Sequence, residues 1–343
     1  MKALVLHAPN TPFSLETVPD PEPGPSEAVV KVLACGSGLT IQHMKAGRGS
    51  IEYPRIIGHE LTGEIIALGS GVKRLAIGDA VTAYFYLSCG HCRWCLTNRE
   101  TLCENLGGNV GRDCDGGYAE YMKLPAKNFI KLPEGLDWRT YPAEIAVITD
   151  AIATPWKVIR RGRVSATDTV VVFGAGGGLG IHMLMMAKWA HARVIAVEIR
   201  PEKFEACRAA GADYVVDGGR NHVLEALQDI TGGKGADVTI DFVGTDTTLR
   251  TAAEALGRGG RMVMMAGEGE LRIPGQIFRG KEAEILGSRY CTKQEVADAL
   301  NIVARGQVWP LVTEIGTMED AEAIHERVAQ GMVTGRAALR ITP

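Results

Sequence analysis

The chain has 343 residues and a formal net charge of −3, and 46% of its residues are hydrophobic. This length and composition are typical of a globular protein with two domains. No basic run and no apolar stretch of eighteen residues occurs, so the sequence favours neither nucleic-acid binding nor a membrane span. The first ten residues, "MKALVLHAPN", lack the features of a secretory signal, and a cytoplasmic location is therefore expected.

Short apolar runs broken by glycine and proline fill residues 1 to about 148. They read ALVLH, EAVVKVLA, LTGEIIALG and DAVTAYFY. Runs of this length with turn residues between them predict a mainly β domain.

From about residue 150 strands and helices alternate. The expected strands are DTVVVFGAG, RVIAVE and ADVTIDFVG. Each is followed by an expected helix, in turn GIHMLMMAKWA, PEKFEACRAAG and TDTTLRTAAEALG. Strands buried on both faces with helices between them predict an α/β fold, a doubly wound parallel sheet. The last fifty-odd residues do not follow this alternation of strands and helices. Helices are expected near 293–305 and 318–329, followed by a final strand GRAALRIT. The expected domains are therefore 1–150, 151–287, and 288–343, the last rejoining the first.

A glycine-rich turn joins the first strand of the second domain to its helix. The turn brings the backbone close enough to contact a pyrophosphate, and the helix N-terminus offers free N–H groups to phosphate oxygens. The loop residues expected to bind the dinucleotide are Gly174, Gly176, Gly177, Gly178, Leu179 and Gly180.

An acidic residue follows this loop at the end of the next strand. Glu198 is placed to accept hydrogen bonds from the two ribose hydroxyls of an adenosine, and its charge would repel a 2′-phosphate. NAD is therefore favoured over NADP. Arg200, however, would pair with that phosphate if it faced the ribose, so the preference stays open.

Four cysteines stand together as C-x2-C-x2-C-x7-C. Four thiolates close a tetrahedral shell around Zn²⁺ and leave no position for water or substrate, so the motif predicts a structural zinc in a lobe over 88–104. Its ligands would be Cys89, Cys92, Cys95 and Cys103.

With these two features the whole chain resembles the zinc-type alcohol dehydrogenase family of the medium-chain dehydrogenases/reductases. The motifs GHE (58–60), DGGYAEYM (115–122), GAGGGLG and GRAALR fall in the family's order. The resemblance implies a GroES-like catalytic domain, split around a Rossmann domain, and a homodimer or homotetramer. It also implies that Arg336 approaches the cofactor pyrophosphate.

The resemblance fails at the ligands of the catalytic zinc, which in the family are a cysteine, the histidine of GHE and a second cysteine. Aligned without gaps, Thr40 and His43 match the family's proton relay and His59 is the metal histidine. Gly38 and Asp150 stand at the two cysteine positions, and Ile41 replaces the aspartate that supports the histidine. The catalytic zinc is therefore expected to be altered or absent.

Other interpretations of these residues stay open. A shift of three residues would make Cys35 a ligand, with Ser37 as the relay hydroxyl. His59, Glu60 and Asp150 would suit a different, harder metal. Alternatively, Glu60 forms a salt bridge and Asp150 caps the following helix.

The expected activity is NAD(P)-dependent hydride transfer to or from a secondary alcohol or ketone, with Thr40, His43, His59 and Asp150 as catalytic residues. Without zinc, His59 would donate a hydrogen bond to the substrate oxygen, oriented by Asp150. One alternative is reduction of a C=C bond conjugated to a carbonyl, because charge then spreads over an enolate. Another is an inactive nucleotide-binding sensor or structural protein. The expected metal content is one zinc per chain.

Overall fold

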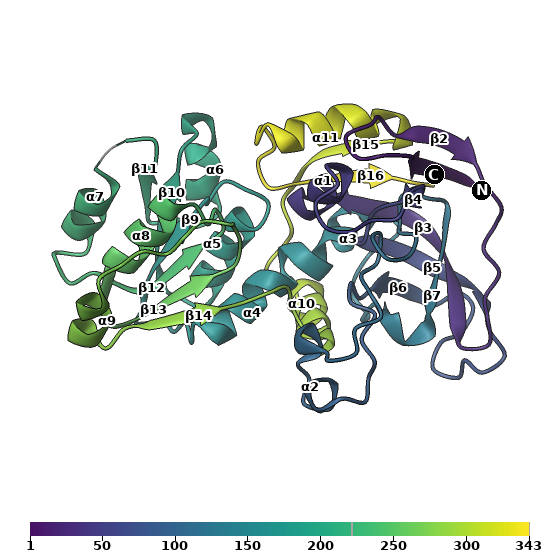
Figure 1. Cartoon of the computed structure of the whole chain (residues 1–343), viewed down its shortest axis with the longest axis horizontal. Coiled ribbons are helices and arrows are strands. Elements are labelled where there is room, and N and C mark those ends of the chain that lie inside the picture. The colour runs from purple at the N-terminus through teal and green to yellow at the C-terminus, as the bar shows by residue number, and fades with distance from the viewer. Residues whose placement is uncertain (221, 343) are drawn as a thin grey trace. The chain divides into compact units, whose positions relative to one another are not determined.

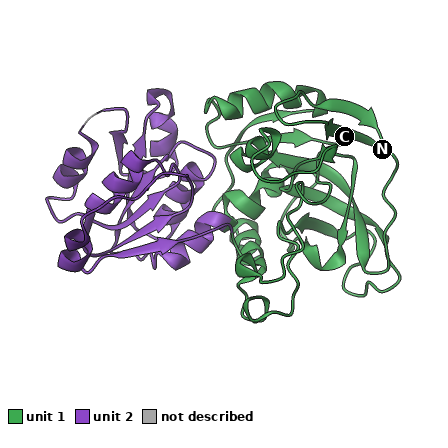
Figure 2. Ribbon diagram, in the orientation of Figure 1, with its two compact units in different colours: residues 1–153, 291–343 green, residues 154–290 purple. Residues whose placement is uncertain are grey.

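The structure is a computed structural model that describes residues 1–220 and 222–342. The chain forms two compact units, residues 1–153 with 291–343 and residues 154–290 (Figure 2). The chain therefore leaves the first unit, builds the second and returns. Among the described residues, no helix is long and apolar enough to cross a membrane.

The first unit is built on β-sheets, as predicted (Figure 1). The larger sheet has the order β15-β16-β3-β5-β6-β8, and β7 also pairs with β3. Its strands are β3 (Glu27–Ser37), β5 (Leu61–Leu68), β6 (Ala80–Ala83), β7 (Tyr121–Pro125), β8 (Phe129–Lys131), β15 (Val312–Gly316) and β16 (Arg336–Arg340). A smaller sheet, β2-β1-β4, contains β1 (Lys2–Leu6), β2 (Ser14–Thr17) and β4 (Arg55–Ile56).

The antiparallel pairing of β3 with β16 joins distant parts of the chain. Ala337 lies opposite Ser37, and Ala338 lies opposite Gly36. Extending this register by one residue places Arg336 opposite Gly38, just beyond the end of β3. The C-terminal strand thus brings an arginine to the position where the resemblance expects a metal ligand.

The helices of this unit flank the sheets. They are α1 (Leu39–Lys45), α2 (Arg93–Leu96), α3 (Pro142–Ala151), α10 (Lys293–Ala304) and α11 (Ala321–Ala329), with 3-10 turns Glu100–Leu102, Ala126–Asn128 and Met318–Asp320. The predicted helix near 293–305 is confirmed, and a capping box between Thr292 and Glu295 fixes its start. The predicted strand DAVTAYFY is shorter in the structure and ends at Ala83. The N–H of Tyr84, the next residue, donates to the carbonyl of Asn128.

The second unit is a doubly wound parallel sheet, as predicted, with the order β11-β10-β9-β12-β13-β14. Its strands are β9 (Thr169–Phe173), β10 (Arg193–Glu198), β11 (Tyr214–Asp217), β12 (Ala236–Asp241), β13 (Leu256–Met264) and β14 (Glu284–Gly287). Its helices are α4 (Ala153–Arg161), α5 (Gly180–Trp189), α6 (Phe204–Ala209), α7 (Val223–Ile230), α8 (Asp246–Glu254) and α9 (Gly275–Lys281), with a 3-10 turn Pro201–Lys203. The strand order reverses beside β9, and the glycine turn follows that strand.

Candidate active site

A buried arginine and two buried carboxylates form one cluster in the first unit. One guanidinium nitrogen of Arg336, Nη2, contacts both Asp150 Oδ2 and Glu60 Oε1, the latter at 3.0 Å. Arg336 is 4% exposed, Asp150 7% and Glu60 0%. We call these three residues the Arg336 cluster. Its members come from β16, the last turn of α3, and the segment before β5.

Two glycines, Gly36 in β3 and Gly38 directly after it, leave room for the cluster. A Cβ at position 38 would lie 2.2 Å from Nη1 of Arg336, and a Cβ at position 36 would lie 2.7 Å from Oε2 of Glu60. Alternate residues of a strand face the same side, so both missing side chains open the same space. The guanidinium therefore occupies the volume that a cysteine at position 38 would need.

His59 lies beside this cluster. Its Nε2 is 4.0 Å from Oε1 of Glu60, and its ring packs against Phe85 with centroids 4.4 Å apart. The ring is 2% exposed, and its buried Nδ1 has no hydrogen-bond partner among the described residues. Burial lowers the pKa of His59 to about 4, so the imidazole is neutral near pH 7. The ring then has one N–H donor to offer.

The electrostatics of Glu60 follow from the same burial. Desolvation raises the pKa of this carboxyl to about 8, although the neighbouring Arg336 acts in the opposite direction. Near pH 7 the proton-bound form of Glu60 is therefore substantially populated. Asp150 supplies the second carboxylate to the guanidinium.

Thr40 and His43 both lie on α1, three residues apart and thus on one face of the helix. Thr40 is exposed and His43 is half-buried. His43 Nε2 lies 3.2 Å from Nη1 of Arg48. Ile41 between them is fully buried, so the position of the family's supporting aspartate is apolar here.

The glycine turn of the second unit has the tight geometry that the sequence predicts. Gly174 has a φ of +72°, and a Cβ on Gly180 would lie 2.1 Å from the carbonyl oxygen of Gly174. Glu198 ends β10, and its Oε2 accepts a 2.7 Å hydrogen bond from the N–H of Gly176. Arg200 extends instead toward Glu202, at 3.4 Å. This hydrogen bond joins the acid directly to the loop.

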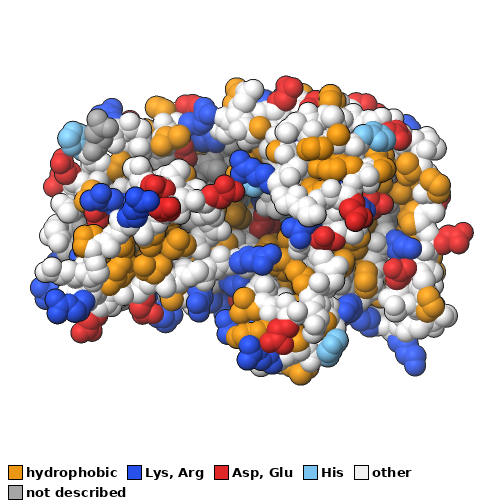
Figure 3. All heavy atoms as spheres, in the orientation of Figure 1, with side chains coloured by type: hydrophobic (Ala, Val, Ile, Leu, Met, Phe, Trp, Pro, Cys, Tyr) orange, Lys and Arg blue, Asp and Glu red, His pale blue; other side chains and the backbone are white. Residues whose placement is uncertain are grey.

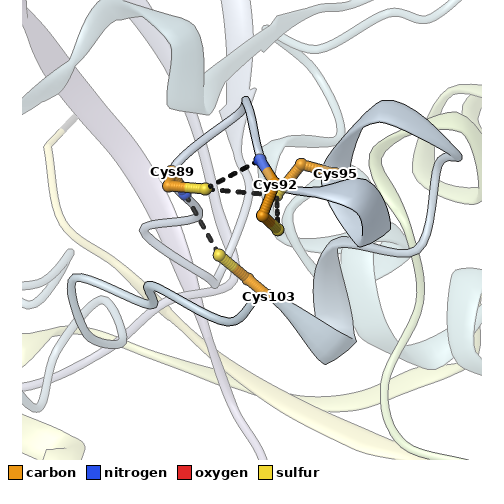
Figure 4. Close-up of side chains that lie close together, drawn as sticks. All are labelled: Cys89, Cys92, Cys95 and Cys103. Carbon is orange, nitrogen blue, oxygen red and sulfur yellow. Dashed lines mark hydrogen bonds between the residues drawn. The ribbon is translucent and has the colours of Figure 1, made fainter.

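The four cysteines converge in the lobe around α2, and their sulfur atoms point toward one another (Figure 4). All four lie within 4.8 Å of one another. A zinc–sulfur distance of about 2.3 Å in a tetrahedron requires sulfur separations of about 3.8 Å. The separations Cys89–Cys95 at 3.9 Å and Cys92–Cys95 at 3.6 Å fit that requirement. The residues present therefore fit a structural zinc.

Replacing Cys103 with serine is expected to remove the zinc and to lower the thermal midpoint of the first unit. Three thiolates and a hydroxyl hold zinc more weakly, and metal binding of this kind contributes directly to folding. Elemental analysis should show a loss of one zinc per chain. Cys207→Ala, in the second unit, is the matched control and should keep its zinc; equal zinc loss in both variants would contradict the assignment.

Comparison with known proteins finds family models that match parts of both units. The model of the alcohol dehydrogenase GroES-like domain matches residues 24–134, and that of the zinc-binding dehydrogenase matches residues 178–305. An alcohol dehydrogenase of Geobacillus stearothermophilus is 33% identical over 99% of both chains. The chain belongs to the zinc-type alcohol dehydrogenase family.

Two further similarities concern activity. A crystal structure of an NAD-dependent alcohol dehydrogenase has a TM-score of 0.91 and 29% identity, covering 100% of both chains. An acryloyl-coenzyme A reductase of Sulfurisphaera tokodaii is 29% identical over 99% of this chain and 100% of its own. This member of the alcohol dehydrogenase family is thus an oxidoreductase of the medium-chain type.

The catalytic zinc of the alcohol dehydrogenase family does not fit the residues of this chain. Gly38 has no side chain to donate, and the guanidinium of Arg336 fills the space beside it. Asp150 and Glu60 are both engaged with that guanidinium. Among the described residues, only the four cysteines of the lobe bring three or more metal-binding atoms together.

The shifted alignment, with Cys35 as a ligand, also lacks support. Cys35 lies in β3 with its sulfur against Gly58 and Gly117, and a 2.5 Å hydrogen bond joins Ser37 Oγ to the hydroxyl of Tyr118. These side chains therefore alternate with Gly36 and Gly38 and face the other side of the strand.

Sequence reasoning placed Arg336 near the cofactor and did not connect it with Glu60 and Asp150. A signal was present in the alternating glycines at 36 and 38. In a strand, such a pair indicates that another group approaches one face closely. Which group fills the space depends on the pairing of β3 with β16.

Proposed function

We propose that this protein interconverts a secondary alcohol and a ketone with NAD, without a catalytic zinc, and carries one structural zinc per chain. The observation that carries the proposal is the neutral, buried His59, whose Nδ1 has no partner among the described residues. A buried ring nitrogen of this kind is suited to bind a substrate oxygen.

The roles proposed for the residues follow from their positions. The glycine turn and Glu198 would hold the dinucleotide, which supplies or accepts the hydride when bound. His59 would donate a hydrogen bond to the carbonyl oxygen as negative charge develops there. The Thr40 hydroxyl and His43 would pass the proton between that oxygen and solvent, because both lie on one face of α1.

NAD is proposed over NADP because a carboxylate ends β10. Glu198 is 6% exposed and accepts from the N–H of Gly176. A 2′-phosphate beside this carboxylate would meet like charge. Nη1 of Arg200 lies 3.4 Å from Oε1 of Glu202. A cytoplasmic location and a homo-oligomeric state belong to the same proposal.

A second candidate, reduction of a conjugated C=C bond, is favoured by the relative that is an acryloyl-coenzyme A reductase. Hydride would then go to the β-carbon and a proton to the α-carbon. The charge on the oxygen would be spread over an enolate, which needs less stabilisation than an alkoxide. A pocket with an imidazole donor and no zinc suits this demand.

A single substrate separates the two reactions. A cyclic enone offered with NADH deuterated at the transferred position should give the allylic alcohol, with deuterium on the carbinol carbon, if the main proposal holds. Deuterium on the β-carbon of a saturated ketone would establish the second candidate. Tight NADH binding without turnover of ketones, aldehydes or enones would support a sensor role, and higher kcat/KM with NADPH would overturn the NAD preference.

A further inference from the structure

We propose that helix α11 positions helix α1, and with it Thr40 and His43, through two side-chain contacts in which His325 is the main positioning residue. The inference deepens the proposed function, since α1 carries the two residues of the proposed proton relay. Its first test measures the protection of the α1 backbone and does not depend on turnover.

Helix α1 has little stability of its own. It contains seven residues, and its N-cap is Gly38, which has no side chain to accept from the N–H groups of the first turn. Helices this short are marginal in water without tertiary contacts. The position of Thr40 and His43 therefore depends on what holds α1 against the rest of the first unit.

Two side-chain contacts join α1 to α11. Oε1 of Gln42 lies 2.9 Å from Nδ1 of His325. Nζ of Lys45 forms an ion pair with Oε1 of Glu322. The partners are three residues apart on each helix and follow in opposite order, so the contacts are two rungs between antiparallel helices.

A buried hydrogen-bond chain holds His325 from its other side. Its Nε2 lies 2.8 Å from the hydroxyl of Tyr118, whose oxygen lies 2.5 Å from Oγ of Ser37 in β3. Tyr118 and His325 are 0% exposed and Ser37 is 1% exposed. Because Ser37 directly precedes Gly38, the chain ties α11 to the end of β3, where α1 begins.

The tautomer of His325 follows from its partners. Burial lowers the pKa of its imidazole to about 3, so the ring is neutral near pH 7 and carries one N–H. The amide oxygen of Gln42 can only accept, which places that proton on Nδ1. Nε2 then accepts from the Tyr118 hydroxyl, and the Tyr118 oxygen accepts from Ser37. A side chain without both ring nitrogens therefore breaks the chain.

The contacts with α11 lie on the side of α1 away from the proposed relay. With about 3.6 residues per turn, Gln42 and Lys45 project roughly opposite to Thr40 and His43. Lys45 is buried, whereas Thr40 is exposed. Helix α11 can therefore hold α1 without covering the two relay residues.

The first measurement is hydrogen exchange in α1 of His325→Phe. Phenylalanine keeps a ring beside Phe13, where the centroids are now 5.1 Å apart, but makes neither hydrogen bond. The Tyr118 hydroxyl retains the carbonyl of Gly36 at 3.4 Å. The amides of residues 39–45 are expected to exchange about tenfold faster, the effect of losing one hydrogen bond of average strength. Those of α3 should not change.

Three further variants test the assignment. Arg327→Ala is the matched control, because Arg327 also lies on α11 but pairs with Glu314 of β15, and its α1 amides should exchange as in the wild type. His325→Asn keeps an amide N–H near the position of Nδ1 and should restore most of the protection. If His325→Phe does not fold, Gln42→Leu removes the same hydrogen bond from α1.

A kinetic measurement tests the link to the relay. The kcat of His325→Phe is expected to fall about tenfold, part of the roughly 10²–10⁴-fold that a positioned proton-transfer group supplies. The Kd for NADH should stay unchanged, because the glycine turn lies in the other unit. His325→Phe/His43→Ala should be no slower than His43→Ala, since a misplaced relay histidine and an absent one lose the same step.

The outcomes separate this inference from the proposed function. Unchanged exchange in α1 of folded His325→Phe or Gln42→Leu overturns the inference, as do additive losses of His325→Phe and His43→Ala. Equally faster exchange throughout the first unit would also contradict it, because His325 would then stabilise the whole unit. Faster exchange confined to α1 supports it, even if no ketone, aldehyde or enone is turned over and the proposed function fails.

Discussion

Asp150→Ala is expected to lower the free energy of unfolding by about 3 kcal/mol or more, because breaking a buried ion pair leaves an uncompensated charge. Arg336 would keep its contact with Glu60, whose own pKa is raised by burial to about 8. Urea unfolding followed by tryptophan fluorescence measures the loss. The reaction rate should fall as well, since the groups beside His59 would shift.

The matched control is an arginine–carboxylate pair at the surface. Arg327 and Glu314 are in contact, with side chains 41% and 24% exposed. Glu314→Ala should cost less than about 1 kcal/mol, because solvent screens such a pair. In a double-mutant cycle, Asp150→Ala with Arg336→Ala should cost less than the sum of the single variants. Equal losses at Asp150 and Glu314 would show that the Arg336 cluster contributes no more than a surface pair.

Gly180→Ala is expected to weaken NADH binding about 100-fold. The added methyl group would lie 2.1 Å from the Gly174 oxygen and 2.8 Å from the Ala175 Cα, so the backbone of the turn or of α5 must move. Forced displacement of packed backbone costs about 1–3 kcal/mol, and about 1.4 kcal/mol corresponds to a tenfold change in affinity. Calorimetric titration with NADH measures the change.

A neighbouring glycine provides the control. A Cβ on Gly177 would lie 3.3 Å from the same Gly174 oxygen, a contact that a shift of a few tenths of an ångström relieves. Gly177→Ala should therefore bind NADH within about fivefold of the wild type, on the same scale of about 1.4 kcal/mol for a tenfold change. If Gly180→Ala binds as tightly as Gly177→Ala, the turn is not limited by this contact, and the explanation fails.

The surface agrees with the charge pattern of the sequence. On the face drawn in Figure 3, lysine and arginine side chains alternate with aspartate and glutamate, and no broad basic field is formed. This mixture follows from nearly balanced totals, 37 basic and 40 acidic residues. Small-molecule chemistry, which the family membership shows, needs no such field.

The sequence by itself determined the features whose residues are close together in the chain. The cysteine spacing brought the four sulfurs of the lobe together, and the glycine run after an apolar strand produced the turn before α5. Such motifs are local: a few backbone angles set their geometry, so spacing alone predicts it. The α/β class followed for the same reason, from hydrophobic periodicity within each segment.

Only the tertiary structure decided which group lies beside the empty side-chain position of Gly38. Four separate segments of the chain contribute Gly38, Glu60, Asp150 and Arg336. No rule of sequence spacing relates these residues. They meet because β16 pairs with β3 in one register, which sets Arg336 against the empty side-chain position of Gly38. A slip of one residue would turn that arginine to the other face of the sheet, so its place depends on the packing of the whole unit.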